Sequence, residues 1–310
     1  MSSHEGTATA PSRGRVTIEE LTKTYGDGDG RVVAVDDLDL EIEPGEFVTV
    51  LGPSGCGKST LLDCIAGHVE PTAGQITVDG EPVSGPDPSR GVVFQENRLF
   101  PWKTVQENVA FGPSVRDRST DCVEILLDRM GLSGFADSYP KELSGGMAQR
   151  AELARLLANE PAIMLMDEPF SGLDVMTKQR MQVELLSAWR ETDATALFVT
   201  HDVEEAILLG DRVVVMTARP GTVKTVVDVP LDRPRDHGSR TSEGVTQLKQ
   251  HLLASIHDEA GVEFATQESS ETDQRIEREP EPDSKHRPNA TGHGADEVDA
   301  PTQHTGEVDR

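Results

Sequence analysis

Residues 15–95 have the pattern of short strands separated by turns. Apolar and polar residues alternate over 15–21 and 32–43, as in half-buried strands, and glycine, aspartate and proline separate these segments. The mostly apolar stretch 46–52 predicts a buried strand that runs into a glycine-rich loop, and helical spacing follows over 58–67. Residues 74–83 predict a hairpin that turns at Asp79 and Gly80, and 91–95 predict another strand.

Helical spacing replaces the strand pattern between about 96 and 158. Over 120–132, one helical face carries the apolar residues Val123, Leu126, Leu127 and Met130. Strands return at 162–169, 194–202 and 212–221 with helical segments between them, which is the alternation of a parallel sheet with crossover helices. The pattern predicts an α/β protein with a parallel-sheet core, an antiparallel β-subdomain and an inserted α-helical subdomain.

The same pattern divides the chain into segments. Residues 1–13 predict a disordered N-terminus, 14–235 the main domain with its helical subdomain at about 96–158, and 236–261 a C-terminal helix. Residues 262–310 predict an acidic disordered tail, either merely solvated or used for interactions. Because the sequence has no long apolar run and no recognisable signal peptide, we expect a chain that does not cross a bilayer by itself.

Charge is the feature of the composition that changes this picture most. The 310 residues include 55 acidic and 29 basic ones, for a net charge of −26. Residues 262–310, with 13 acidic and 5 basic residues, supply only −8 of that charge. The rest of the chain is therefore strongly acidic, which favours adaptation to high salt (a halophilic protein) over the effect of a tail alone. Such a surface repels phosphate backbones and argues against a nucleic-acid partner.

The three cysteines have no metal-binding spacing. Their odd number in a chain of this size predicts reduced thiols and a cytosolic protein. Cys56 lies inside the glycine-rich loop, where it serves as a small residue or makes the site sensitive to alkylation.

The glycine-rich loop at 52–60 matches the phosphate-binding pattern G-x-x-x-x-G-K-[ST] between a predicted strand and a predicted helix. In this arrangement the loop amides surround the phosphates, Lys58 offers positive charge to the β- and γ-groups, and the Ser59 hydroxyl binds Mg²⁺. The predicted nucleotide-binding residues of the loop are Gly52, Pro53, Ser54, Gly55, Cys56, Gly57, Lys58, Ser59 and Thr60.

Two adjacent carboxylates end the apolar strand predicted at 162–169. Asp167 is expected to hold Mg²⁺, and Glu168 to polarise the water that attacks the γ-phosphate. Such a pair is costly to desolvate without a cation or hydrogen bonds, so a purely structural role is disfavoured. A base beside the magnesium ligand indicates hydrolysis of the nucleotide rather than transfer of phosphate to a small molecule.

Further motifs follow in a specific order. Gln95 follows a strand, LSGGMAQR (143–150) precedes a helix, SGLD (171–174) follows the acidic pair, and His201 ends a strand. With these motifs, residues 15–235 resemble the nucleotide-binding subunit of ATP-binding cassette (ABC) transporters. The resemblance implies a RecA-like P-loop NTPase fold, ATP and Mg²⁺ as ligands, and a head-to-tail homodimer.

The resemblance also implies residue roles. Ser144, Gly145 and Gly146 of one copy would cap the ATP held by the first glycine loop of the other copy. Gln95 would sense Mg²⁺ and the attacking water, Asp174 would communicate across the dimer, and His201 would contact the γ-phosphate. Tyr25 would stack on adenine. Ala148 stands where the family usually has a basic residue, which makes the surface of the helix after the second loop less certain.

Residues 95–112 and 218–236 resemble the nitrate, sulfonate and taurine branch of importers. This implies a peripheral subunit on the cytoplasmic face of the membrane, working with an integral membrane permease and an external solute-binding protein. Phe100, Pro101 and Trp102 would lie near the groove that receives the permease, although Trp102 has the alternative of packing inside the helical subdomain. A soluble ABC-type ATPase and a non-enzymatic regulatory binder remain as alternatives, and the cargo stays open.

Overall fold

The computed structural model describes residues 13–235 and 244–256 of the chain. The predicted disordered segments at 1–13 and 262–310 lie outside these ranges, apart from Arg13. So do both ends of the helix predicted at 236–261, of which residues 244–256 are helical.

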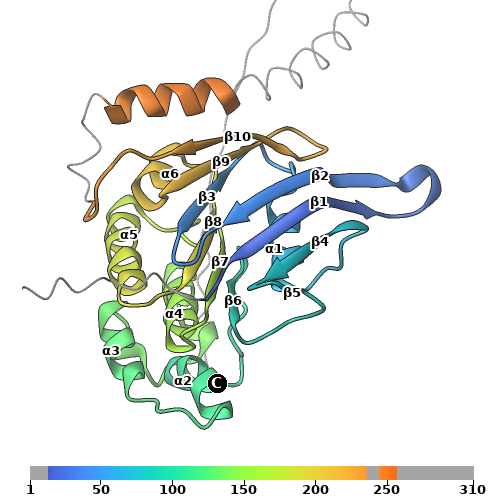
Figure 1. Ribbon diagram of the computed structural model, residues 1–310. Helices are drawn as coiled ribbons and strands as arrows, with labels where there is room; N and C mark the ends of the chain where they lie inside the picture. Colours follow the sequence, from blue (N-terminus) through green and yellow to red (C-terminus); the bar gives the residue numbers. More distant parts are fainter. Residues whose placement is uncertain (1–12, 236–243, 257–310) are drawn as a thin grey trace, which may run out of the picture. The chain divides into compact units, whose positions relative to one another are not determined.

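Two sheets form the framework of the described residues (Figure 1). The six-stranded sheet has the order β10-β9-β3-β8-β7-β6, and its strands from β9 to β6 are parallel. Its strands are β3 (Phe47–Leu51), β6 (Arg90–Val93), β7 (Ile163–Asp167), β8 (Thr195–Val199), β9 (Arg212–Met216) and β10 (Val223–Asp228). The antiparallel sheet has the order β2-β1-β4-β5, with β1 (Val16–Tyr25), β2 (Val32–Ile42), β4 (Ala73–Val78) and β5 (Glu81–Pro82).

Helices connect the parallel strands and build the helical subdomain. They are α1 (Lys58–Ala66), α2 (Val105–Val115), α3 (Cys122–Arg129), α4 (Gly145–Ala158), α5 (Val175–Arg190) and α6 (Val203–Leu209). Of these, α2, α3 and α4 lie within the stretch predicted to be helical. Polar caps begin several of them: the Thr104 side chain accepts from the backbone of Glu107 at α2, and Asp202 does the same for two amides at α6.

Both faces of the parallel sheet are covered, which explains why β3, β7 and β8 are buried at every position and mostly apolar. Along β7, Met164 and Met166 pack with α2, α3, α4 and α5 on one face. Ile163 and Leu165 point to the other face and pack with α1 and the antiparallel sheet. A third cluster packs Val245 and Leu252 of the 244–256 helix against α6 and β9.

The structure differs from the sequence-based expectation at one edge of this sheet. Residues 223–228 form β10, an antiparallel edge strand paired with β9, whereas only a strand over 212–221 was predicted. The burial along β10 is mixed, so the segment lacks the apolar run that identified its parallel neighbours.

Candidate functional site

The first glycine-rich loop joins the end of β3 to the start of α1. All residues of β3 are buried, so the strand fixes where the loop begins. Gly57 precedes α1 with a φ of 102°, and a Cβ atom there would lie 2.6 Å from the carbonyl oxygen of Ala34. A larger residue would meet both a backbone strain and a collision, so the close packing of the loop against β2 requires glycine here.

The Lys58 side chain folds back onto its own loop. Its Nζ donates to the carbonyl oxygens of Gly52, at 2.9 Å, and Pro53, at 2.8 Å. The residue is only 7% exposed, so these carbonyls replace the hydration of the ammonium group. The loop therefore carries a buried positive charge next to its backbone amides, which suits a phosphate group.

Asp167 and Ser59 form a pair of oxygen donors between β7 and α1. Asp167 is 8% exposed, and burial raises the pKa of its carboxyl while a hydrogen bond from Ser59 opposes that shift. A buried carboxylate beside a hydroxyl fits Mg²⁺, which binds few protein oxygens and completes its shell with water and phosphate oxygens. Within 13–235 and 244–256, no three His, Cys, Asp or Glu side chains lie together as a metal site. A metal at Asp167 and Ser59 would therefore need water or phosphate oxygens as further ligands.

Glu168 lies between two other predicted catalytic residues. His201 Nδ1 is 3.2 Å from Glu168 Oε1, and Gln95 Nε2 is 3.4 Å from Glu168 Oε2. The backbone of Glu168 has a φ of 45°, held by a hydrogen bond from its N–H to Val199 and one from Ser171 to its carbonyl. A non-glycine residue in this sparsely populated backbone conformation costs free energy, and such strain is concentrated at functional sites.

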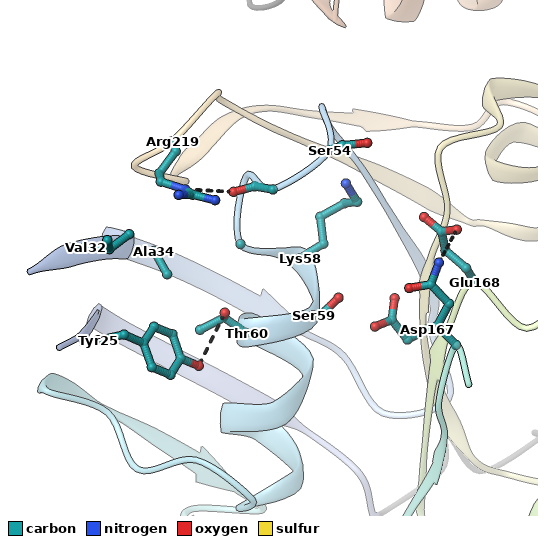
Figure 2. A pocket seen from close by; sticks show the side chains of 13 residues that line it. Tyr25, Val32, Ala34, Ser54, Lys58, Ser59, Thr60, Asp167, Glu168 and Arg219 are labelled. Carbon is teal, nitrogen blue, oxygen red and sulfur yellow. Dashed lines mark hydrogen bonds between the residues drawn. The ribbon is translucent and has the colours of Figure 1, made fainter. Parts of the chain in front are cut away.

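Apart from His201, which contacts Glu168 but is not part of the lining, these residues line one cavity of about 360 Å³ (Figure 2). The lining residues are Tyr25, Val32, Ala34, Ser54, Gly55, Gly57, Lys58, Ser59, Thr60, Gln95, Asp167, Glu168 and Arg219. Asp167 ends β7, Gln95 follows β6 and the first glycine loop follows β3, so the site collects at the carboxyl ends of parallel strands. The lysine, hydroxyl and carboxylate side chains of this cavity suit a nucleotide with its phosphates at the loop.

Tyr25 lies at the rim of this cavity. Its hydroxyl is 3.5 Å from Thr60 Oγ1, and its side chain is 42% exposed. The ring lines the cavity together with Val32 and Ala34, and Lys23 Nζ lies 5.1 Å from its centre. Its exposure leaves room for a base to stack on the ring.

Arg219 is a site residue that the sequence analysis missed. It comes from the turn between β9 and β10, and its Nε donates to the carbonyl oxygen of Gly55 at 3.1 Å (Figure 2). Arg219 is a second cationic residue in the cavity lining, in addition to Lys58. The sequence offered no motif for it, because the contact joins segments that are 164 residues apart.

Several predicted site residues are not among the described residues that line the cavity. Gly52, Pro53 and Cys56 lie within the loop but outside the lining. Cys56 is 1% exposed, and burial raises the pKa of its thiol, with Lys58 opposing the shift. The alternative that Cys56 makes the site sensitive to alkylation is therefore disfavoured, because the sulfur is inaccessible and mainly protonated.

The second glycine loop and Asp174 lie at the starts of two helices. Ser144 Oγ accepts a hydrogen bond from the backbone N–H of Met147 and caps α4. Asp174 caps α5 through the N–H groups of Met176 and Thr177, and hydrogen bonds from Thr177 lower the pKa of its carboxyl. None of Ser144, Gly145, Gly146 and Asp174 lines the cavity among the described residues.

A buried lysine in a glycine loop, a Ser–Asp pair fitted to Mg²⁺ and a glutamate beside a histidine define a P-loop nucleotide hydrolase. The comparisons with known proteins agree. The family model described as ABC transporter matches residues 35–171. An uncharacterized ABC transporter ATP-binding protein of Methanocaldococcus jannaschii is 47% identical over 249 residues, which cover 79% of this chain and 92% of that protein.

Two further similarities are informative. The aliphatic sulfonates import ATP-binding protein SsuB of Bacillus thuringiensis subsp. konkukian is 44% identical, over 77% of this chain and 94% of that protein. A dimeric structure of a post-hydrolysis state of the ATP-binding cassette MJ0796, bound to ADP and Pi, aligns with a TM-score of 0.64 and 32% identity, over 70% of this chain and 100% of that one.

The chain therefore belongs to the ATP-binding proteins of ABC transporters. It is an ATPase that uses ATP and Mg²⁺. The α/β fold and the family expected from the motifs are confirmed. Within the two described ranges, no helix combines the length and the apolar character needed to cross a membrane.

Proposed function

We propose that this protein is the ATP-hydrolysing subunit of an importer and works as a head-to-tail homodimer. The observation that carries this proposal is the separation of the two glycine loops. The first loop lines the cavity, whereas Ser144, Gly145 and Gly146 lie at the start of α4 and outside it. A second copy, turned head to tail, would bring its second loop to the open side of the cavity.

Gly145 supports this arrangement. A Cβ atom added at Gly145 would meet no atom of the chain within 4 Å, so packing within one copy does not require glycine there. A glycine that neither packing nor backbone conformation within the chain requires is typical of a place where another molecule approaches the backbone closely. The N-terminus of α4 presents free amides and a positive dipole end, both suited to a γ-phosphate. The solved cassette with ADP and Pi, to which this chain is similar, is described as dimeric.

Within each cavity the residues divide the work of hydrolysis. Lys58 and the loop amides bind the phosphates, and Ser59, Asp167 and Gln95 would hold the metal. Bound Mg²⁺ supplies charge neutralisation at the phosphate oxygens. Glu168 accepts the proton of the attacking water, and His201, 3.2 Å from it, contacts the γ-phosphate. Tyr25 stacks on the base, and Asp174 relays the state of one copy to the other.

A second groove provides the contact with the membrane partner. Aromatic and basic side chains of the helical subdomain and β6 line it, including Phe94, Phe100 and Phe111. The Arg98 guanidinium lies 3.7 Å from the centre of the Phe94 ring. Trp102 is 70% exposed, and its ring centre is 5.5 Å from that of Phe100. An exposed tryptophan beside an aromatic groove is typical of an interface anchor, which favours permease docking over internal packing of Trp102.

The class of transported solute is proposed from similarity to relatives. The similarity to an aliphatic sulfonates import protein supports a small anionic solute of the nitrate, sulfonate or taurine type. The importer would then also contain an external solute-binding protein, and this subunit would sit peripherally on the cytoplasmic face of the membrane. A soluble ABC-type ATPase without a transport partner is the alternative.

Uptake by a strain that lacks this gene tests the proposal. The strain is complemented with the wild type, Glu168→Gln or Trp102→Ala, and the uptake of an aliphatic sulfonate, taurine and nitrate is measured. We expect Glu168→Gln to keep ATP binding but lose both turnover and uptake. Trp102→Ala should keep the ATPase activity of the isolated subunit and lose most of the uptake, because its surface lies away from the nucleotide. If deletion changes the uptake of none of these solutes and the protein does not co-purify with membrane proteins, the soluble alternative holds.

A further inference from the structure

A group of polar side chains connects α5 to the segment that carries His201. Lys178, on α5, places its Nζ 2.9 Å from Asp202 Oδ2 and 2.7 Å from Glu205 Oε1. Gln182, one turn further along α5, donates from its Nε2 to Glu205 Oε1 at 3.1 Å. The start of α6 is thus fastened to α5 by charged and polar contacts.

The same contacts hold the two residues on either side of His201. Thr200 Oγ1 donates to Glu205 Oε2 and accepts from the backbone N–H of Asp202 at 3.0 Å. Asp202 Oδ1 in turn accepts from the N–H groups of Glu204 and Glu205. His201 itself has a side chain that is 69% exposed, and its Nδ1 lies 3.2 Å from Glu168 Oε1. Its position is therefore set mainly by its neighbours in the chain rather than by packing around the ring.

The Glu205 side chain is buried, so losing one of these contacts would leave its carboxylate without a substitute for water. Glu205 is 4% exposed and Thr200 is 2% exposed, so the Glu205 carboxylate depends on Lys178, Gln182 and Thr200 in place of water. Burial alone would lower the pKa of Lys178, but its hydrogen bonds to Glu205 and Asp202 outweigh burial and raise that pKa. Burial would raise the pKa of Asp202, but the hydrogen bond from Lys178 leads to a net lowering. Lys178 and Asp202 are thus both charged at neutral pH.

Lys178 also lies one helical turn from the segment expected to face a second copy. Its backbone N–H donates to the carbonyl oxygen of Asp174 at 2.8 Å, and Asp174 begins α5. A rigid helical turn therefore separates Asp174 from the ammonium group that holds Asp202 and Glu205. A displacement of the start of α5 would be passed directly to the residues around His201.

We propose that Lys178 is a positioning residue for ATP hydrolysis, which holds Asp202 and Glu205 so that His201 keeps its place and follows the movement of the Asp174 segment. This inference rests on the proposed function, because Asp174 has a role only if a second copy binds beside it. Lys178 touches neither the nucleotide cavity lining nor Glu168 among the described contacts. Its effect reaches the reaction through the segment it fastens.

The test compares purified full-length variants in steady-state ATP hydrolysis. Lys178→Met should lower kcat by about tenfold or more with little change in the KM for ATP, because small misplacements of a catalytic group cost large factors in rate. Lys178→Arg should retain most of the activity, since a guanidinium can bridge the same two carboxylates. Lys249→Met is the matched control: it removes the ion pair between Lys249 of the 244–256 helix and the Glu204 carboxylate of α6. The hydrogen bond from the backbone N–H of Glu204 to Asp202 stays in place, so kcat should be unchanged.

A double variant separates positioning from folding. Lys178→Met leaves a buried carboxylate without its cation, so Lys178→Met/Glu205→Gln removes both charges while the glutamine can keep polar contacts with Thr200 and Gln182. We expect this variant to unfold at a temperature near that of the wild type and still to have a low kcat. The inference is overturned if the double variant hydrolyses ATP at the wild-type rate. It is equally overturned if its apparent kcat falls only in proportion to the number of ATP-binding sites lost with unfolded protein.

Measuring the wild type in parallel at several protein concentrations separates failure of the Lys178 role from failure of the proposed dimer. If the wild type associates on adding ATP and Lys178→Met retains full activity, only the role of Lys178 fails. If the wild type hydrolyses ATP as a monomer, the proposed dimer fails and the coupling through Asp174 fails with it.

Discussion

Asp167 and Glu168 are adjacent carboxylates in different environments. Asp167 is buried and receives a hydrogen bond from Ser59, which suits a metal ligand. Glu168 turns away through its positive φ and faces Gln95 and His201. Two neighbouring carboxylates can thus take two roles, because the backbone directs them to different partners.

The thiols give a prediction at the scale of single residues. Cys56 and Cys64 are buried, and burial raises the pKa of Cys56 and raises that of Cys64 to about 11. Cys122 is partly accessible, although burial and nearby Glu160 raise its pKa too. We expect iodoacetamide near neutral pH to modify Cys122 slowly and the other two hardly at all in the folded protein, with no loss of ATPase activity.

Mass spectrometry of the alkylated peptides measures this, and the protein unfolded in urea is the control in which all three thiols react. Rapid modification of native Cys56 accompanied by loss of ATP binding would contradict the buried position of its sulfur. It would restore the view that this loop is sensitive to alkylation.

The sequence predicts individual site residues where a local motif fixes their chemistry. Lys58, Ser59 and Asp167 are recognisable because their spacing reflects a strand, a loop and a helix that are continuous in the chain. Arg219 and Lys178 are not recognisable in this way. Their contacts with Gly55 and Glu205 depend on how separate segments pack, and an isolated arginine or lysine carries no signal of that packing.

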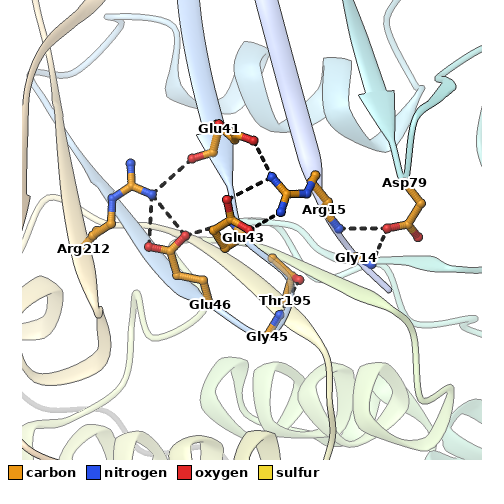
Figure 3. A network of polar contacts seen from close by, with 9 residues as sticks. All are labelled: Gly14, Arg15, Glu41, Glu43, Gly45, Glu46, Asp79, Thr195 and Arg212. Atoms are coloured by element: carbon orange, nitrogen blue, oxygen red, sulfur yellow. Dashed lines mark hydrogen bonds and ion pairs between the residues drawn. The ribbon is translucent and has the colours of Figure 1, made fainter. Parts of the chain in front are cut away.

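At the scale of elements, apolar runs in the sequence predict the central parallel strands. The polar contacts that join the two sheets cannot be predicted from the hydrophobic pattern. Figure 3 shows a polar network at that junction. Arg15, just before β1, pairs with Glu41 and Glu43, and Arg212 of β9 pairs with Glu46. In an acidic chain many carboxylates could serve each arginine, so the sequence alone does not specify these partners.

The start of α4 gives a prediction at this scale. Ser144→Arg should leave ATP binding by the first loop near the wild-type affinity, because Ser144 is outside the cavity lining. It should block closure of the dimer with a bulky cation and lower hydrolysis by about 100-fold, the usual cost of removing a donor at a transferring group. Nucleotide binding and steady-state ATPase assays measure the two effects.

Ser144→Thr is the matched control, because threonine can still cap α4 while keeping a small side chain. Its hydrolysis should stay close to the wild-type rate. Normal ATP hydrolysis by Ser144→Arg would mean that the second glycine loop does not contribute to the phosphate site, and the head-to-tail arrangement would have to be abandoned.

At the scale of the whole molecule, the net charge of −26 opposes association. Two acidic copies repel each other over distances set by the Debye length, which is about 8 Å at physiological ionic strength. In the proposed dimer, binding of the second loop to ATP would have to overcome this repulsion, so closure should become easier as salt screens the two surfaces. Association and hydrolysis are therefore best compared at more than one salt concentration.

The central claim is that each nucleotide cavity is completed by a second copy of the chain. The most direct test is the ATPase activity per chain as a function of protein concentration, with sedimentation of the same samples in ATP. The account predicts that activity per chain rises with concentration and reaches a plateau as dimers form. Activity per chain that stays constant at concentrations where sedimentation finds only monomers would contradict it.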